Sequence, residues 1–149
     1  MTRRPGQTGF TIYEAMMVLL VVAIVVGVLT PSVRRQLTRA RINRAANVMA
    51  ADLFLAQSLA GRQRVPVTVT YDVTAKTATI VDSRSAGPTF ITRRYGPDSD
   101  FKLQSIAATP TAIVVLPNGM ASAALTVTLS DGTYQRRIRM TRAGLIRVN

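Results

Sequence analysis

The chain has 149 residues, a formal net charge of +12, and neither cysteine nor histidine. This length suits one membrane element and one small domain with a modest core. The missing cysteine and histidine exclude disulfides, thiol catalysis and thiolate metal sites, and they remove the commonest metal ligand and general base. The positive charge comes almost wholly from arginine, which pairs with phosphate and carboxylate in a bidentate way, so the surface is predisposed toward polyanions.

A strongly apolar run without charge extends from Ala15 to Val33. As a helix it is long enough to cross most of a hydrocarbon core of ~30 Å, so it predicts a membrane anchor. A carboxylate, Glu14, stands directly before this run. An ionised side chain at membrane depth is costly and rarely lacks a partner, which makes Glu14 a candidate functional residue.

The motif Gly9-Phe10-Thr11 followed by Glu14, between a basic leader and an apolar helix, resembles the prepilin signal of type IV pilins and type II secretion pseudopilins. The resemblance implies that the prepilin peptidase cleaves between Gly9 and Phe10 and that the new amine of Phe10 is methylated. Glu14 then becomes the fifth residue of the mature chain. Pro31 falls where many pilins have a proline that loosens the helix, so we expect a helix bend there.

Cleavage would leave a cation on Phe10 and an anion on Glu14, one turn further along the helix. Helices that pack side by side with a small axial stagger could pair the amine of one subunit with Glu14 of the next, which would offset the desolvation of both charges. The alternative is an ordinary signal peptide or a plain membrane anchor. A removable secretory signal usually ends in a small-residue cleavage site, whereas this run ends in Leu29-Thr30-Pro31-Ser32 and continues into a helical pattern.

The charges that flank the apolar run disagree about orientation. Arg3 and Arg4 in the leader (residues 1–9) favour a cytoplasmic N-terminus under the positive-inside rule. Five arginines just after the run favour the reverse; they could meet anionic headgroups or neighbouring subunits, or form a solvated helical face. The prepilin motif requires the leader in the cytoplasm, so we expect a single-pass inner-membrane protein with its C-terminal domain in the periplasm. The five are Arg34, Arg35, Arg39, Arg41 and Arg44.

The helix is expected to continue past its membrane half (residues 10–33) as an amphipathic half (residues 34–62), with Gly61 as its C-cap. Apolar residues recur there at helical spacing, which predicts a stripe that packs against a sheet. The stripe consists of Ile42, Ala46, Met49, Leu53, Ala56 and Ala60, widened by Val48, Leu55 and Leu59.

Residues 63–149 have the alternating pattern and turn residues of an antiparallel β domain. Strands are expected over 67–71, 77–81, 90–95, 101–106, 112–116, 124–129, 134–141 and 145–149. Asp98 and Asp100 lie in one of the turns, but two carboxylates are too few for calcium, and we expect no metal site. The predicted fold is α+β, with a long N-terminal helix on an antiparallel sheet.

The sequence VLPNGMASAALTVTLSDGTYQRRIRMTRAGLI resembles the C-terminal half of the H-type pseudopilin and FimT-like minor pilin family. That resemblance implies a pilin-like fold closed by a turn-forming Pro-x-Gly, two long strands and a final strand marked by glycine. With the N-terminal motif it extends over most of the chain, and residues 82–110 match least.

Alternation in the final strands places Arg137, Arg139 and Arg147 on one solvent face, with Arg142 at the turn. Such a surface suits a phosphate backbone bound without sequence preference. FimT-like minor pilins are thought to capture DNA through a motif of glycine, arginine, any residue, arginine, but the matching positions here begin Gly144-Leu145 and lack the first arginine. The alternatives are an acidic protein partner, or arginines that keep the strand soluble and discourage edge pairing.

These patterns predict a subunit of a filament rooted in the inner membrane. We expect a minor pseudopilin of type II secretion; the alternative is a minor pilin of a type IV pilus that binds DNA for uptake. The expected partners are other pilins or pseudopilins, the prepilin peptidase, inner-membrane lipid and, under the alternative, DNA. Neither enzymatic activity nor a cofactor is expected, because the carboxylates are scattered and no phosphate-binding glycine loop occurs.

Overall fold

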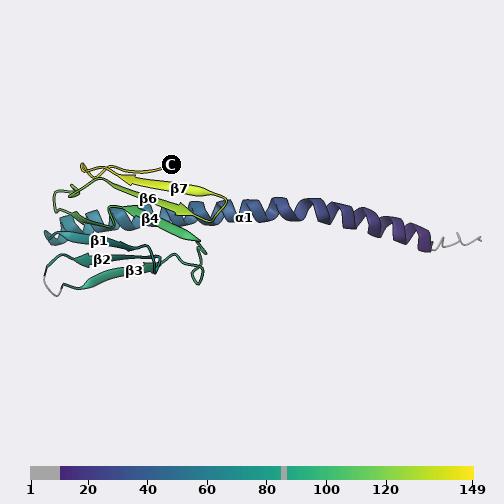
Figure 1. The fold of residues 1–149 in the computed structure, drawn as a ribbon, viewed down its shortest axis with the longest axis horizontal. Coiled ribbons are helices and arrows are strands. Elements are labelled where there is room, and N and C mark those ends of the chain that lie inside the picture. The colour runs from purple at the N-terminus through teal and green to yellow at the C-terminus, as the bar shows by residue number, and fades with distance from the viewer. Residues whose placement is uncertain (1–10, 85–86) are drawn as a thin grey trace, which may run out of the picture. The chain divides into compact units, whose positions relative to one another are not determined.

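The computed structural model describes residues 11–84 and 87–149, without the side chains of residues 28–31. Within this part of the chain one long helix, α1 (Ile12–Gln63), precedes eight strands (Figure 1). The strands are β1 (Val67–Asp72), β2 (Thr77–Asp82), β3 (Thr89–Arg94), β4 (Ser105–Thr109), β5 (Ala112–Val115), β6 (Leu125–Ser130), β7 (Gln135–Met140) and β8 (Ile146–Val148).

The chain consists of two units, the first ending at Leu37 and the second running from Thr38 to Asn149. In the first unit the described side chains of α1 from Ile12 to Gly27 are all exposed, although most are large and apolar. By length and composition, α1 is long and apolar enough to cross a membrane.

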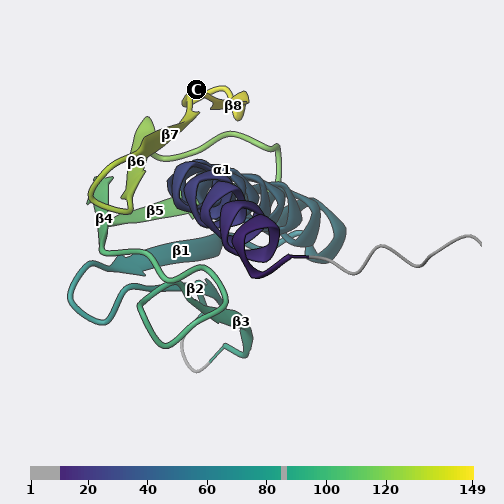
Figure 2. The same cartoon turned by 90° about the vertical axis from the view of Figure 1, so that its right-hand side faces the viewer.

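The second unit contains two four-stranded antiparallel sheets, with strand orders β3-β2-β1-β5 and β4-β6-β7-β8. In the end-on view of Figure 2, β5 lies beside β1 and β4 beside β6, so the two sheets follow one another. This arrangement confirms the predicted α+β class, with the antiparallel strands divided between two sheets.

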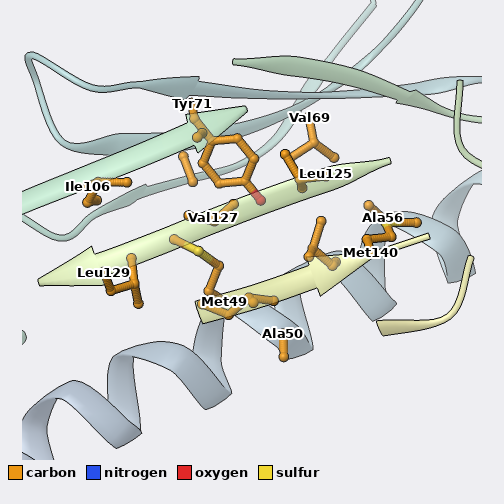
Figure 3. Packing of buried hydrophobic residues seen from close by; sticks show 14 of the residues in the cluster. Met49, Ala50, Ala56, Val69, Tyr71, Ile106, Leu125, Val127, Leu129 and Met140 are labelled. Carbon is orange, nitrogen blue, oxygen red and sulfur yellow. The ribbon is translucent and has the colours of Figure 1, made fainter. Parts of the chain in front are cut away.

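The predicted helical stripe forms one wall of the core: all six residues from Ile42 to Ala60 named above are at most 2% exposed. Of the residues expected to widen it, Val48 and Leu59 pack against the core, whereas Leu55 is 37% exposed. Figure 3 shows the strand side chains that meet the helix. They include Val69 and Tyr71 of β1, Ile106 of β4, Leu125, Val127 and Leu129 of β6 and Met140 of β7, around Met49, Ala50 and Ala56 of α1.

Two local predictions are wrong. The helix continues through Gly61 to Gln63, and Arg64, with φ of 55°, takes the left-handed conformation just after it. The strand expected over 101–106 begins only at Ser105. Phe101 and Leu103 are buried because the loop folds under the domain: the Phe101 and Tyr95 rings stack at 5.1 Å, and the Leu103 amide donates to the Tyr95 carbonyl at 3.0 Å.

Candidate functional site

The N-terminal motif is described from Thr11 onward; Gly9 and Phe10 lie outside the described residues. The Glu14 amide donates to Thr11 Oγ1 at 3.3 Å, and the Ala15 amide donates to the Thr11 carbonyl at 3.1 Å. Thr11 is therefore the N-cap of α1, with Glu14 three residues later at the spacing of a capping box. The motif that the resemblance assigned to processing and assembly also begins the helix.

The Glu14 side chain is exposed and stands in the first turn of α1, where the helix dipole favours a negative charge. Among the described residues, no cation lies within ion-pair distance of its carboxylate. An anion next to such an apolar surface lacks a partner within the described chain, which is the condition that pairing between subunits would satisfy.

At position 31 helix α1 is continuous. The side chain of Pro31 is outside the described residues, and the bend expected there stays a prediction.

The C-terminal arginines gather on the exposed face of β7 and β8. In β7 the exposed Arg137 and Arg139 alternate with buried Ile138 and Met140, as predicted. The register places Arg139 directly opposite Arg147 of β8. Arg137 lies opposite Asn149, with which it exchanges two backbone hydrogen bonds of 2.8 and 2.9 Å. We call Arg137, Arg139 and Arg147 the strand arginine patch.

Like charges directly opposite each other on a sheet repel, so the Arg139–Arg147 pair favours an anion between or above the two side chains. A shallow hollow of about 420 Å³ lies there, lined by Arg139, Arg147 and three neighbours. The two arginine–carboxylate pairs in the described part of the chain involve other arginines, Arg84 and Arg93. Arg142 is exposed in the β7–β8 turn and does not line this hollow.

A second cluster of cations was not predicted. Alternation puts Arg136 on the same face as Ile138 and Met140, yet it is exposed at the start of β7. Its Nε donates to Oδ1 of Asn43 on α1 at 2.6 Å. On the same helix the guanidinium of Arg39 lies 4.6 Å from the centre of the Tyr134 ring. The signal that could have revealed this cluster is a charge at a position whose alternation assigns it to the core face.

Two glycines quoted in the family resemblance lie close together. Gln57 Nε2 on α1 donates to the carbonyl of Gly144 at 2.8 Å and to that of Gly119 at 3.3 Å. Gly144 has φ of 85°, and a Cβ there would collide with the Gly119 carbonyl oxygen and lie 2.6 Å from Gln57 Nε2. This contact ties the β5–β6 loop and the β7–β8 turn to the helix.

A buried polar cluster joins α1 to the end of β3. Asp52 is 8% exposed and accepts hydrogen bonds from Arg93 Nε at 2.6 Å, Arg93 Nη2 at 2.9 Å and the Tyr95 hydroxyl at 3.2 Å. Burial, followed by the charge of Asp52, raises the pKa of Tyr71 and of Tyr95. The hydrogen bond to Asp52 likewise raises the pKa of Arg93. These groups are all satisfied by one another, so the cluster positions the helix rather than forming a reactive site.

Similarity to known proteins covers most of the second unit. The family model described as the type II transport protein GspH matches residues 45–144. No curated protein sequence matches the chain.

The type IV minor pilin FimU of Pseudomonas aeruginosa matches in two crystal forms. The TM-scores are 0.60 and 0.58 at 18% and 17% identity, over 74% and 72% of this chain and 90% and 91% of FimU. The minor pseudopilin EpsH from the type 2 secretion system of Vibrio cholerae matches with a TM-score of 0.58 at 14% identity, over 73% of this chain and 96% of EpsH. At these identities the structural matches establish the fold.

Proposed function

The chain belongs to the family of the type II transport protein GspH, and on that premise we propose that it is a minor pseudopilin, processed by the prepilin peptidase and assembled into a filament of a type II secretion system. Residues 1–9 would be the leader, residues 10–33 the membrane half of the helix, residues 34–62 its amphipathic half, and residues 63–149 the β domain. The chain would be anchored in the inner membrane with the β domain in the periplasm.

The observation that carries this proposal is the start of α1. A capped helix presents one carboxylate, Glu14, at the head of a long apolar surface, and no described residue neutralises that carboxylate. The amine freed on Phe10 of a neighbouring subunit is a cation of the right charge within reach of one helical turn. Pairing the two in a lipid-lined bundle would lower the desolvation penalty of both and select the stagger between subunits.

Intact mass spectrometry of the chain extracted from membranes tests the processing step. The expected mass lacks residues 1–9 and carries one added methyl group on Phe10. Gly9→Ile, which fills the position before the cut with a bulky branched side chain, should leave the leader attached. An uncut wild-type chain would contradict the proposal and favour a plain membrane anchor.

The two filament systems differ in what is lost when the gene is deleted. Under our proposal, secretion of a folded exoprotein falls while pilus-dependent motility and DNA uptake persist. The opposite pattern would place the chain in a type IV pilus.

A second candidate function, DNA capture by a pilus subunit, is favoured by the strand arginine patch, where Arg139 and Arg147 oppose each other without a described carboxylate partner. Against it stands Leu145, at the position where the DNA-capturing motif has arginine.

A gel shift with residues 34–149 tests DNA capture. Replacing the three patch arginines by alanine should weaken binding. If each arginine neutralises one phosphate, the replacement should also lower the slope of log affinity against log salt by about 2.7. The control removes three exposed arginines elsewhere, Arg41, Arg62 and Arg94. No shift at low salt, or equal loss in both triple variants, would contradict specific capture by the patch.

A further inference from the structure

A small basic cleft opens between the second unit's part of α1 and the start of β7. It has a volume of about 280 Å³. This is slightly below the range of about 300–1,000 Å³ typical of small-molecule sites, so the cleft suits a small group rather than an extended ligand. Its walls are Arg39, Ile42 and Asn43 of α1 and Tyr134, Gln135 and Arg136 at β7.

Both guanidinium groups of the cleft are held by uncharged partners. Arg136 gives its Nε proton to Asn43 Oδ1 at 2.6 Å, which leaves the N–H groups on its two terminal nitrogens. Arg39 lies over the Tyr134 ring at 4.6 Å, a contact that uses the face of the guanidinium and leaves its in-plane donors. The cleft therefore presents two oriented cations with donors to spare.

Neither cation is neutralised by the described chain. The two arginine–carboxylate pairs found in residues 11–84 and 87–149 are Arg84–Asp82 and Arg93–Asp52. Asp131 is near in sequence, and its amide donates to the Tyr134 carbonyl at 3.1 Å, but its carboxylate neither lines the cleft nor forms an ion pair there. Two arginines aimed at one small space and lacking an acid suit a bound anion, most simply a phosphate, which arginine binds in a bidentate way.

The chain itself keeps this cleft close to the membrane-spanning segment. Arg39 is six residues past Val33, where the apolar run ends. Six residues span about 9 Å as a helix and at most about 21 Å fully extended, whatever arrangement the two units adopt. Polar headgroups occupy the layer next to the hydrocarbon core, and tyrosine and arginine are enriched in proteins at that level.

We infer that the cleft formed by Arg39, Asn43, Tyr134 and Arg136 binds the phosphate headgroup of an anionic membrane lipid. Arg136 and Arg39 bind the phosphate oxygens, Asn43 and Tyr134 hold the two guanidinium groups in place, and the acyl chains remain in the bilayer. The site makes the start of β7 a second attachment of the β domain to the membrane surface, and it accounts for arginines following the apolar run on the side opposite to the leader. This inference depends only on the membrane anchoring in the proposed function, and not on processing or filament assembly.

The test uses the full chain in lipid nanodiscs that contain equimolar phosphatidylglycerol and phosphatidylcholine. Native mass spectrometry of the released protein measures which lipid stays bound. Wild type should retain phosphatidylglycerol preferentially, and Arg39→Gln or Arg136→Gln should each reduce that preference about fivefold, the effect of one basic residue at a membrane surface. Arg62→Gln, an exposed arginine in the last turn of the same helix, is the matched control and should leave the preference unchanged.

Two further arms separate the site from its competitors. Asn43→Ala keeps every charge but releases Arg136, so it should weaken retention less than Arg136→Gln and more than Arg62→Gln. Millimolar inorganic phosphate should not displace the lipid, because the acyl chains keep the headgroup at high effective concentration. All variants should unfold at the wild-type temperature by circular dichroism, which excludes misfolding as the cause.

Several outcomes would overturn the inference. Equal loss in Arg62→Gln would mean general charge attraction, and displacement by phosphate would mean a free-anion site. Unchanged lipid preference, with loss of contact to other subunits in the cleft variants, would mean an acidic protein partner. A chain that does not stay in the nanodiscs contradicts the anchoring part of the proposed function, whereas a retained chain without lipid preference contradicts this inference alone.

Discussion

Thr11 and Glu14 serve the local structure of α1 as well as the proposed assembly. Thr11 caps the helix through its hydroxyl, and Glu14 is the acid that a capping box and the helix dipole both favour in the first turn. Loss of function in Glu14→Ala alone would therefore be ambiguous, because alanine removes the charge and half of the capping box together. Glutamine at this position separates the two roles, since it suits the capping box without carrying a charge.

Gly144 is the residue whose replacement should most affect the second unit. It has φ of 85°, and any side chain there meets the Gly119 carbonyl and Gln57. Gly119 has nearly the same φ, 82°, but a Cβ added there would have nothing within 4 Å. The pair therefore separates backbone strain from steric crowding.

We expect Gly119→Ala to lower the free energy of unfolding by about 1 kcal/mol, the cost of the left-handed conformation alone. Gly144→Ala should cost about 1–3 kcal/mol more, because the helix contact must open as well. Urea unfolding of residues 34–149 measures both. Equal losses would mean that the glycine–Gln57 contact contributes nothing beyond conformation.

Among the secondary-structure elements, the polar cluster between α1 and β3 makes the stability of the second unit dependent on alkaline pH. Burial and the Asp52 charge raise the pKa of Tyr71 and Tyr95, so the folded chain keeps protons that the unfolded chain releases near pH 10. Above about pH 10 the unfolded state binds fewer protons, and the free energy of unfolding must fall as pH rises.

The expected fall is about 1.4 kcal/mol per pH unit for each of the two tyrosines once the unfolded chain is ionised. Urea unfolding at pH values on either side of about 10 measures it. Tyr71→Phe and Tyr95→Phe should each flatten the decline, because phenylalanine has no proton to lose. A decline as steep in the double variant as in wild type would contradict this assignment.

Residue patterns predicted the elements better than the contacts between them. The stripe from Ile42 to Ala60 and the alternation of Arg137 and Arg139 with buried neighbours follow from helix and strand periodicity, and both are confirmed. Alternation tells which face of a strand is buried but not which strand is its neighbour, so the division into two sheets could not be read from it. Phe101 and Leu103 alternate as a strand would, yet loop packing buries them.

The candidate sites show the same limit. The strand arginine patch lies within one hairpin, so local periodicity placed it. The cleft of Arg39 and Arg136 and the Asp52–Arg93 pair join residues that are far apart in the sequence, and nothing in the local pattern of either partner indicates the other. Only the tertiary fold brings them together.

In the whole molecule the two units have different tasks. The first supplies an apolar helical surface headed by Glu14, and the second supplies a packed domain with two basic surfaces, the strand arginine patch and the basic cleft. Membership of the GspH family and the fold shared with FimU and EpsH agree with a subunit whose role is assembly rather than catalysis.

The most direct test of that assembly is the incorporation of Glu14→Gln into filaments, measured by cross-linking the full chain to neighbouring subunits in membranes. Thr11→Ala, which weakens the helix cap but keeps the charge, is the control. We expect Glu14→Gln to be inserted, cut and methylated but to fail to cross-link, whereas Thr11→Ala should cross-link nearly as wild type does. Cross-linking of Glu14→Gln at the wild-type level would contradict the pairing of charges on which the proposed assembly rests.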